Sequence, residues 1–278
     1  MVEQEADTDE PLTETFIRQV HQVMLREDYK AYRQLPGGKT TSYTVHAGRY
    51  KTRPNSVITP TGERFEYASP EETPALMADL VQWYNNAVSE GALTPIQLAA
   101  LFHYRYIRIH PFEDGNGRIA RLMVNFILRR HNWPMMVIRS KNKKAYLNAL
   151  GLADATVGPI PADGAHASLK AIAPFVGYME SALTADISSM LEFLSGDKET
   201  MWWYEGEIIR FSTTTPGRIL RVLQSDPNAS LSTISTTLGI SRSAIQKQVD
   251  NLAEKGYIIR PEGKKRGWTV NVRDCKDA

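Results

Sequence analysis

Twelve residues in the middle of the chain combine the groups that chemistry on a phosphate ester needs. They run from His110 to Arg121 and read His-Pro-Phe-Glu-Asp-Gly-Asn-Gly-Arg-Ile-Ala-Arg. His110 is the group of this stretch that can move a proton near neutral pH. Asp114 supplies a hard oxygen ligand for magnesium, and Arg118 and Arg121 supply fork-shaped donors for phosphate. Together these residues predict a site for a nucleoside triphosphate.

The residues around this stretch predict how it is positioned. Pro111 and the pair Gly115 and Gly117 interrupt regular structure, whereas the apolar residues on both sides have helical spacing. We therefore expect a loop that leads into a helix start, where free backbone N–H groups and the positive end of the macrodipole suit phosphate. The alternative is a glycine-rich helix cap with two solvated arginines. That alternative does not explain why a base, a metal ligand and an anion cradle stand in register.

The stretch also resembles a known family. It matches, at every fixed position, the signature of Fic-domain enzymes, His-Pro-Phe-x-(Asp/Glu)-Gly-Asn-Gly-Arg-x-x-Arg. The resemblance implies transfer of AMP from ATP, with Mg²⁺, to a Ser, Thr or Tyr hydroxyl of a target protein and of the chain itself.

The same resemblance assigns roles to the residues of the signature. His110 would be the general base. Asp114 would hold magnesium between the phosphates. The amides of Gly115, Asn116 and Gly117 would cradle the phosphates, and Arg118 and Arg121 would clamp the pyrophosphate end. Glu113, at the variable position, is expected on the surface.

A second segment resembles the Fic flap, usually Gly-x-(Tyr/Phe)-Arg-Thr. It reads Gly48-Arg49-Tyr50-Lys51-Thr52, with Lys51 where arginine is commoner. The stretch that follows is broken by Pro54, Pro60 and Gly62, which predicts a short hairpin and loop. The resemblance implies that this flap pairs with the target backbone and positions the acceptor hydroxyl. The residues expected to do so are Thr52, Ser56, Val57 and Ile58.

Another implied contact concerns the adenine. Fic proteins often carry a tyrosine on the helix after the signature that packs on the base, and Tyr146 occupies that place. An asparagine about two turns later usually completes the pocket, but Ala153 and Asp154 stand there. Of the remaining histidines, His103 is expected in the core or pocket wall. His21, His46, His131 and His166 are expected on the surface or in packing.

Composition indicates an ordinary globular chain. It has 278 residues, 42% hydrophobic and 23% charged. No apolar run approaches the roughly 20 residues that span a bilayer. The acidic start lacks the features of a signal peptide, so residues 1–11 are predicted to be a disordered acidic leader. The single cysteine, Cys275, favours a reducing compartment. We therefore expect a cytoplasmic protein without a membrane partner.

The fold predicted from these patterns is mostly α-helical. A helical Fic domain with a short β-hairpin flap is expected over residues 12–185. A linker or bridging helix with a tryptophan-rich continuation is expected over 186–213, and a winged helix-turn-helix domain over 214–278. A helix capped by Thr13 should precede the flap, and Thr94-Pro95 should open the helix that leads to His110.

The last segment is basic, with eleven Lys and Arg against six Asp and Glu from Pro216 onward. Helix, turn with Gly239, second helix and basic hairpin resemble bacterial winged-helix regulators. Arg242 would then face a major groove of DNA, and Lys264, Lys265 and Arg266 its phosphate backbone. The alternative is a dimerisation or target-docking surface. The oligomeric state is left open, with a homodimer among the alternatives.

Other functions remain open alongside AMP transfer. One is a Fic enzyme that removes AMP or transfers phosphate, although the intact Gly115-Asn116-Gly117 weighs against the kinase-like branch. Another is a transcriptional regulator whose Fic domain senses nucleotide.

The inhibitory motif of many Fic enzymes, (Ser/Thr)-x-x-x-Glu-(Gly/Asn), does not occur in the chain. Glu-Gly pairs begin at Glu90, Glu205 and Glu262, and none has Ser or Thr four residues earlier. We therefore expect the inhibitory segment to be missing and Arg121 to be free for the γ-phosphate.

Overall fold

The chain divides into two units, Met1–Asp186 and Ile187–Ala278, and the division falls within one helix. The computed structural model describes residues 2–8, 10–34, 40–58, 64–139, 142–195, 200–260 and 267–275. The helices that lie in the first unit or begin there are α1 (Val2–Ala6), α2 (Glu14–Leu25), α3 (Thr73–Glu90), α4 (Pro95–Ile109), α5 (Asn116–Arg130), α6 (Lys143–Val157), α7 (Pro161–Ala165) and α8 (Ala173–Ser195). The strands of the first unit are β1 (Tyr29–Gln34), β2 (Thr40–Val45), β3 (Val57–Ile58) and β4 (Arg64–Phe65).

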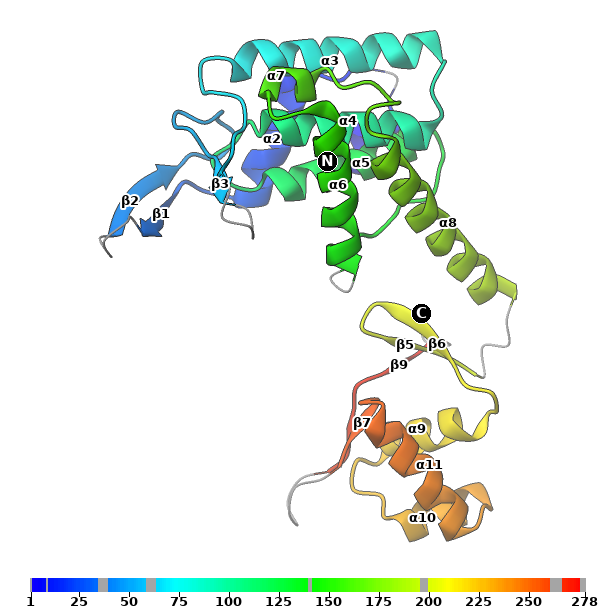
Figure 1. Ribbon diagram of the computed structural model, residues 1–278. Helices are drawn as coiled ribbons and strands as arrows, with labels where there is room; N and C mark the ends of the chain where they lie inside the picture. The colour runs from blue at the N-terminus through cyan, green and yellow to red at the C-terminus, as the bar shows by residue number, and fades with distance from the viewer. Residues whose placement is uncertain are drawn as a thin grey trace. The chain divides into compact units, whose positions relative to one another are not determined.

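Helices α4 and α5 pack on each other at the centre of the first unit (Figure 1). The signature, His110 to Arg121, begins in the loop that joins them and continues into the start of α5. Thr94 and Gln97 cap the start of α4 reciprocally, and Pro95 occupies its first turn, as predicted. α3 packs on α4 and α2 on α5, where the rings of Phe16 and Phe126 lie 5.3 Å apart. Phe126 is buried, and truncating such a residue to alanine costs about 3–5 kcal/mol. The loop at 110–115 is therefore held between two buried helices.

The start of the chain differs from the prediction. The expected disordered leader is instead the short helix α1, which packs on α5. Ala6 is buried, Asp7 forms an ion pair with Arg129 at 3.0 Å, and Arg130 donates to the Thr8 carbonyl at 2.9 Å. The acidic composition of the leader favoured disorder. The prediction failed because the partners that order these residues lie on a helix more than a hundred positions away, which local composition does not reveal.

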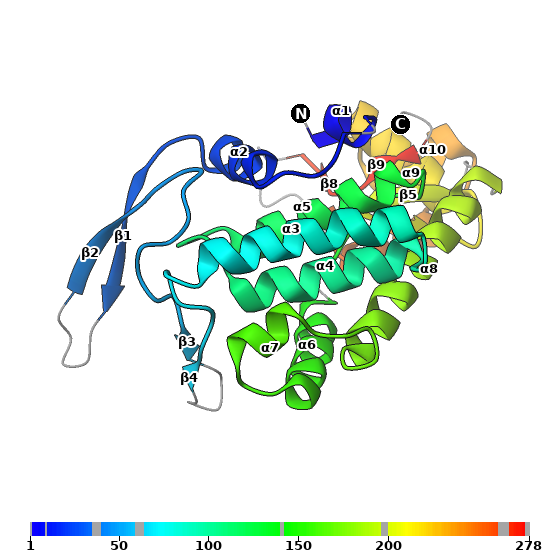
Figure 2. The same cartoon turned by 90° about the horizontal axis from the view of Figure 1, so that it is seen from above.

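Two small hairpins project from the helices (Figures 1 and 2). β3 and β4 form the hairpin predicted after the flap-like segment, with Val57 opposite Phe65. β1 and β2 form a longer hairpin that the sequence analysis did not predict, in which Tyr29 pairs with Val45. The signal for it was present, since Thr40–Val45 is rich in β-branched and aromatic residues. α2 itself begins as predicted, with the Thr13 side chain accepting from the Phe16 amide.

The second unit has the winged helix-turn-helix arrangement that was predicted. Its elements are β5 (Met201–Tyr204), β6 (Glu207–Arg210), α9 (Thr215–Ser225), α10 (Leu231–Leu238), α11 (Arg242–Glu254), β7 (Ile258–Ile259), β8 (Thr269–Val270) and β9 (Arg273–Asp274). Gly239 ends α10 in the left-handed conformation, and Ser241 caps α11 by accepting from the Ala244 amide. The buried core joins Trp202 of β5 to Ile219 of α9 and Ile245 of α11.

The bridging helix expected within 186–213 ends at Ser195. Met201–Arg210 is a hairpin, and β5 also pairs with β9 in a sheet ordered β6-β5-β9. Its turn places Glu205 and Gly206 at φ 48° and 82°, a pair of positive angles that suits two-residue hairpins.

The mostly helical fold class is thereby confirmed. The predicted domain limits stay predictions. No helix among the described residues has both the length and the apolar character needed to cross a membrane.

Candidate functional site

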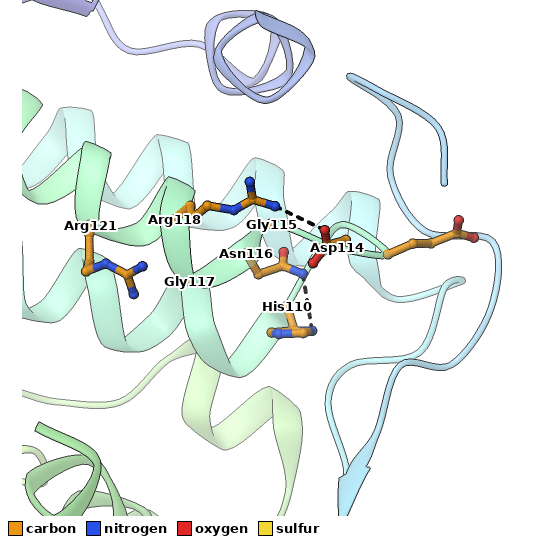
Figure 3. Close-up of a pocket in the computed structure, with 8 residues that line it drawn as sticks. His110, Asp114, Gly115, Asn116, Gly117, Arg118 and Arg121 are labelled. Carbon is orange, nitrogen blue, oxygen red and sulfur yellow. Dashed lines mark hydrogen bonds and ion pairs between the residues drawn. The ribbon is translucent and has the colours of Figure 1, made fainter. Parts of the chain in front are cut away.

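A pocket of about 250 Å³ opens over the loop between α4 and α5. Eight residues line it: His110, Glu113, Asp114, Gly115, Asn116, Gly117, Arg118 and Arg121 (Figure 3). Seven of these are the residues that the sequence predicted for catalysis, metal and phosphate. The loop and the first two turns of α5 therefore bring them to one place, as helix spacing requires for Gly117 and Arg121.

The backbone of His110 is fixed by the flap-like segment. His110 ends α4 in the left-handed conformation, with φ 52° and ψ 59°. The buried Lys51 ammonium donates to the carbonyl oxygens of Ile109 at 3.0 Å and His110 at 2.9 Å. The Asn55 amide donates to the carbonyl oxygens of His110 at 3.0 Å and Phe112 at 2.7 Å. Lys51 and Asn55 thus fix the loop through its backbone carbonyl oxygens. This role of Lys51 and Asn55 was not predicted, because the flap motif by itself carries no sign of it.

Burial lowers the pKa of both Lys51 and His110. Burial lowers the pKa of Lys51 to about 8, although Glu72 opposes the shift. Burial, with the nearby Lys51 charge, lowers the pKa of the His110 imidazole to about 3, whereas Asp114 alone would raise it. The Tyr67 ring stacks on the imidazole at 4.0 Å and removes it from water. His110 is therefore neutral at physiological pH, the form that can accept a proton.

Asn116 fastens the loop to the start of α5. Its Oδ1 accepts from the Phe112 amide at 2.9 Å, and its Nδ2 donates to the Phe112 carbonyl at 2.7 Å. The two bonds to the backbone of one residue, Phe112, fix the orientation of the side-chain amide. Nδ2 also lies 3.3 Å from the His110 Nδ1. Asn116 therefore positions the imidazole as well as the loop, which the sequence analysis did not anticipate.

Asp114 lies at the mouth of the pocket with two partners on one oxygen. Its Oδ2 accepts from the Tyr29 hydroxyl at 2.5 Å and from the Arg118 guanidinium at 3.0 Å. Burial would raise the pKa of Asp114, but the Tyr29 hydroxyl, the Gly115 amide and the Arg118 charge outweigh it and lower this pKa. Asp114 is thus ionised. Tyr29 was not predicted here, because the β1 strand that presents it was not predicted.

His21 supports the same loop from below and is fully buried. Its ring stacks on Phe112 at 3.7 Å. The Gly48 amide donates to its Nδ1 at 2.9 Å, so Nε2 carries the proton that bonds the Asp114 carbonyl at 3.0 Å. His21 is therefore a packing residue, one of the two places expected for it, and it connects α2, the flap-like segment and the loop.

The start of α5 has the features of an anion cradle. Gly115 caps the helix in the left-handed conformation at φ 79°, where a Cβ would lie 2.6 Å from Met24. The amides of Asn116 and Gly117 belong to the first turn, which has no intrahelical acceptor for them. The Gly115 amide already bonds the Asp114 carboxylate. Two of the three predicted amides therefore face the pocket without an intrahelical partner.

Arg121 is supported by an aromatic cluster. The Tyr146 hydroxyl contacts the Arg121 guanidinium and lies 3.1 Å from the Nε2 of His103. Tyr146 is buried and is not among the residues that line the pocket, so its predicted adenine contact stays a prediction. Burial, with the Arg121 charge, lowers the pKa of His103 to about 3, as befits the core histidine that was expected.

The flap residues lie beside the loop. The Thr52 hydroxyl donates to Glu113 Oε1 at 3.1 Å. Val57 and Ile58 form β3 opposite β4, and Ser56 directly precedes this strand. Glu113, for which a surface position was expected, is partly exposed and also lines the pocket. The target-positioning role of these residues stays a prediction.

The residues present fit a magnesium ion that takes most of its ligands from phosphate. No group of three metal-ligating side chains gathers within the described ranges. The pocket does carry the Asp114 carboxylate and the Glu113 Oε2, which is buried without a hydrogen-bond partner. Magnesium is commonly bound by one or two carboxylates together with substrate phosphates. Asp114 and Glu113 therefore suit an ion that enters with a nucleotide.

The predicted DNA contacts divide into two groups. Arg242 is exposed at the start of α11, whereas Ile245 and Val249 of the same helix are buried. Lys264, Lys265 and Arg266 lie outside the described residues. Arg242 is thus placed where a recognition helix presents side chains.

Comparison with known families supports both parts of the chain. Residues 11–128 match the family model described as Fic/DOC family. Residues 213–259 match the model described as winged helix-turn-helix DNA-binding. A solved Fic-domain signalling protein from Bacteroides thetaiotaomicron is 52% identical, with a TM-score of 0.61 over 69% of this chain and 66% of that one.

Two similar curated proteins carry the name protein adenylyltransferase fic-1. The Caenorhabditis briggsae protein is 31% identical over 134 residues, which are 48% of this chain and 25% of the relative. The Caenorhabditis elegans protein is 38% identical over 112 residues, which are 40% of this chain and 20% of the relative. The chain therefore spans a quarter or less of the length of these curated relatives that it matches.

Proposed function

The chain carries a Fic domain of the Fic/DOC family, followed by a winged helix-turn-helix domain, and we propose that it is a protein adenylyltransferase. It would transfer AMP from ATP to a Ser, Thr or Tyr hydroxyl of a target protein and of itself. The observation that carries the proposal is the neutral His110 in one pocket with Asp114, Arg118 and Arg121. A location in the cytoplasm and a homodimer stay predictions.

In the proposed step the hydroxyl oxygen attacks the α-phosphorus of ATP. The bond from this phosphorus to the oxygen that bridges to the β-phosphate breaks, and pyrophosphate leaves. The hydroxyl proton goes to an unprotonated nitrogen of His110. Lys51, Asn55 and Asn116 hold the loop and ring of His110 in place, so little reorganisation is needed.

The phosphates would lie over the start of α5. The amides of Asn116 and Gly117 and the macrodipole stabilise the charge that develops there. Arg118 and Arg121 would bind the β- and γ-phosphates, since both line the pocket one helical turn apart. Bound Mg²⁺ would spread the charge of the displacement, and Asp114 would hold the ion.

Labelled ATP tests this proposal. The protein is incubated with ATP labelled at the α- or the γ-phosphate, and protein-bound label is counted. AMP transfer predicts label from the α-position alone, and His110→Ala should abolish it while nucleotide still binds. The control is His166→Ala, since His166 is exposed and outside the pocket. Label from the γ-position would indicate phosphate transfer, and release of AMP from a pre-labelled protein would indicate removal.

A second candidate function, DNA binding, is favoured by the match at residues 213–259 and by the exposed start of α11. If Arg242 contacts a base edge in the major groove, Arg242→Ala should weaken duplex binding by about 1–3 kcal/mol and relax the sequence preference at that position. Lys255→Ala, at the opposite end of α11, is the control. No binding of the unmutated protein at low salt would favour the docking surface.

A further inference from the structure

One oxygen of the predicted metal ligand is already engaged by two donors of the chain itself. Oδ2 of Asp114 accepts from the Tyr29 hydroxyl at 2.5 Å and from the Arg118 guanidinium at 3.0 Å. A carboxylate oxygen has about two lone-pair sites. A cation that binds this oxygen must therefore displace at least one donor. The neutral hydroxyl of Tyr29 is the donor that lies outside the signature.

The position of Tyr29 is built into the fold. Tyr29 opens β1 and pairs with Val45, which is buried. The preceding Asp28 accepts from the Ala47 amide at 2.8 Å and forms a hydrogen bond with the His46 Nδ1 at 2.6 Å. His21 holds the Asp114 backbone at 3.0 Å from the same side. The contacts at the base of the hairpin and at the Asp114 backbone thus bring the two side chains together, so the Tyr29–Asp114 bond is a defined feature of the site.

A second tyrosine of the strand shows how specific this contact is. Tyr32 lies three residues further along β1, on the opposite face of the strand, and is 72% exposed. Its side chain has no hydrogen bond within the described residues. The two tyrosines share strand and chemistry, and of the two only Tyr29 bonds a residue that lines the pocket.

We propose that Tyr29 is a positioning residue that competes with Mg²⁺ for the Asp114 carboxylate, so that loading the site with metal releases the β1–β2 hairpin from the signature loop. Without metal, the Tyr29 hydroxyl holds the Asp114 carboxylate beside the Arg118 guanidinium, which compensates the charge of the carboxylate. When the ion binds, Oδ2 turns to it and the hydroxyl is freed. The hairpin is joined to the pocket by this bond, so its mobility becomes a signal of the loaded state. The inference rests on the proposed function only for the assignment of Asp114 as a metal ligand.

Metal binding can be measured without any transfer reaction. Mn²⁺ serves as the probe for Mg²⁺, and free Mn²⁺ is followed by electron paramagnetic resonance, with and without ADP. Tyr29→Phe keeps the ring and removes the competing donor. We expect it to bind Mn²⁺ about tenfold more tightly, which corresponds to about 1.4 kcal/mol, close to the lower end of the free energy of a hydrogen bond to a charged group.

Three controls make this result specific. Tyr32→Phe should leave the affinity unchanged. Asp114→Asn should weaken Mn²⁺ binding, and adding Tyr29→Phe to it should change nothing further. In hydrogen exchange, saturating Mn²⁺ should speed exchange of the β1 amides in the wild type, whereas Tyr29→Phe should exchange fast from the start. Thermal unfolding of Tyr29→Phe verifies that it is folded.

Equal or weaker Mn²⁺ affinity in Tyr29→Phe would overturn the proposal, as would an undiminished effect in the Asp114→Asn background. These outcomes are distinguishable from failure of the proposed function. A protein that transfers AMP but shows no Tyr29 effect retains its function and refutes the competition. A protein that shows the Tyr29 effect but transfers no AMP retains the competition and refutes the transferase.

Discussion

The Lys51 ammonium donates a hydrogen bond to the His110 carbonyl oxygen at 2.9 Å. Lys51 is buried, and its own amide also bonds the Pro111 carbonyl at 2.8 Å. The flap-like segment, which is expected to hold the target, therefore also shapes the loop that carries the proposed base. Arginine, commoner at this position, would bring a larger, branched head group to the same carbonyls.

Replacing Lys51 by methionine should destabilise the loop. The Ile109 carbonyl oxygen and the Asn55 Oδ1 would lose their Lys51 donor. The His110 carbonyl oxygen would keep only its bond from the Asn55 amide. We expect the free energy of unfolding to fall by about 2 kcal/mol. AMP transfer should fall roughly tenfold to a hundredfold, because small misplacements of a base are costly. Denaturant titration and label counting measure both. Lys144→Met, at an exposed position, should change neither.

The pH dependence of transfer should reflect the partly buried His110. Its pKa is lowered to about 3 by burial and by Lys51, so the base stays unprotonated far below pH 6.5. The acid limb of kcat/KM, which reports the free enzyme, should therefore lie well below pH 6.5. Measuring kcat/KM from pH 5 to 8 checks this. A decline with a midpoint near 6.5 would show that the imidazole is solvated.

His103 should make stability depend on pH. Burial, and then the Arg121 charge, lowers its folded pKa to about 3, against the ordinary value of 6.5 for histidine. Between these values the unfolded state binds more protons, so the stability contributed by neutral His103 is lost as pH falls from 6.5 toward 3. The slope is about 1.4 kcal/mol per pH unit. Denaturation of wild type and His103→Gln across this range should show a flatter dependence in the variant. Parallel curves would contradict the prediction.

Tyr146→Phe should weaken ATP binding through Arg121. The hydroxyl contacts both Arg121 and His103, so its loss frees the guanidinium and leaves a buried nitrogen unpaired. We expect KM for ATP to rise about fivefold with a smaller change in kcat, and stability to fall by about 1–2 kcal/mol. Tyr178→Phe is a matched control, because its hydroxyl is buried without a partner. Equal effects in both variants would assign the change to packing alone.

The protein should label itself with AMP without an activating substitution. No carboxylate among the described residues pairs with Arg121, which meets the Tyr146 hydroxyl instead. The guanidinium is therefore open to the γ-phosphate. Incubation of the unmodified protein with α-labelled ATP checks this. If labelling begins only after a carboxylate outside the signature is replaced, an inhibitory group does act on this site.

The sequence alone determined the elements whose signals are local. Thr94 and Pro95 predict the start of α4, and Thr13 predicts that of α2, because capping depends on residues three positions apart. The spacing of His110 to Arg121 placed a base, two arginines and an anion cradle at one helix start for the same reason. The winged helix followed from its helices and the turn at Gly239.

Only the tertiary structure decided what surrounds these residues. Lys51, Asn55 and His21 reach the loop from more than fifty positions away, and no periodicity records such contacts. The lowered pKa of His110 arises from burial under Tyr67 and beside Lys51, which the imidazole by itself does not reveal. Tyr29 meets Asp114 because a hairpin carries it there. The local sequence therefore fixed which groups are present, whereas long-range packing fixed their protonation and their partners.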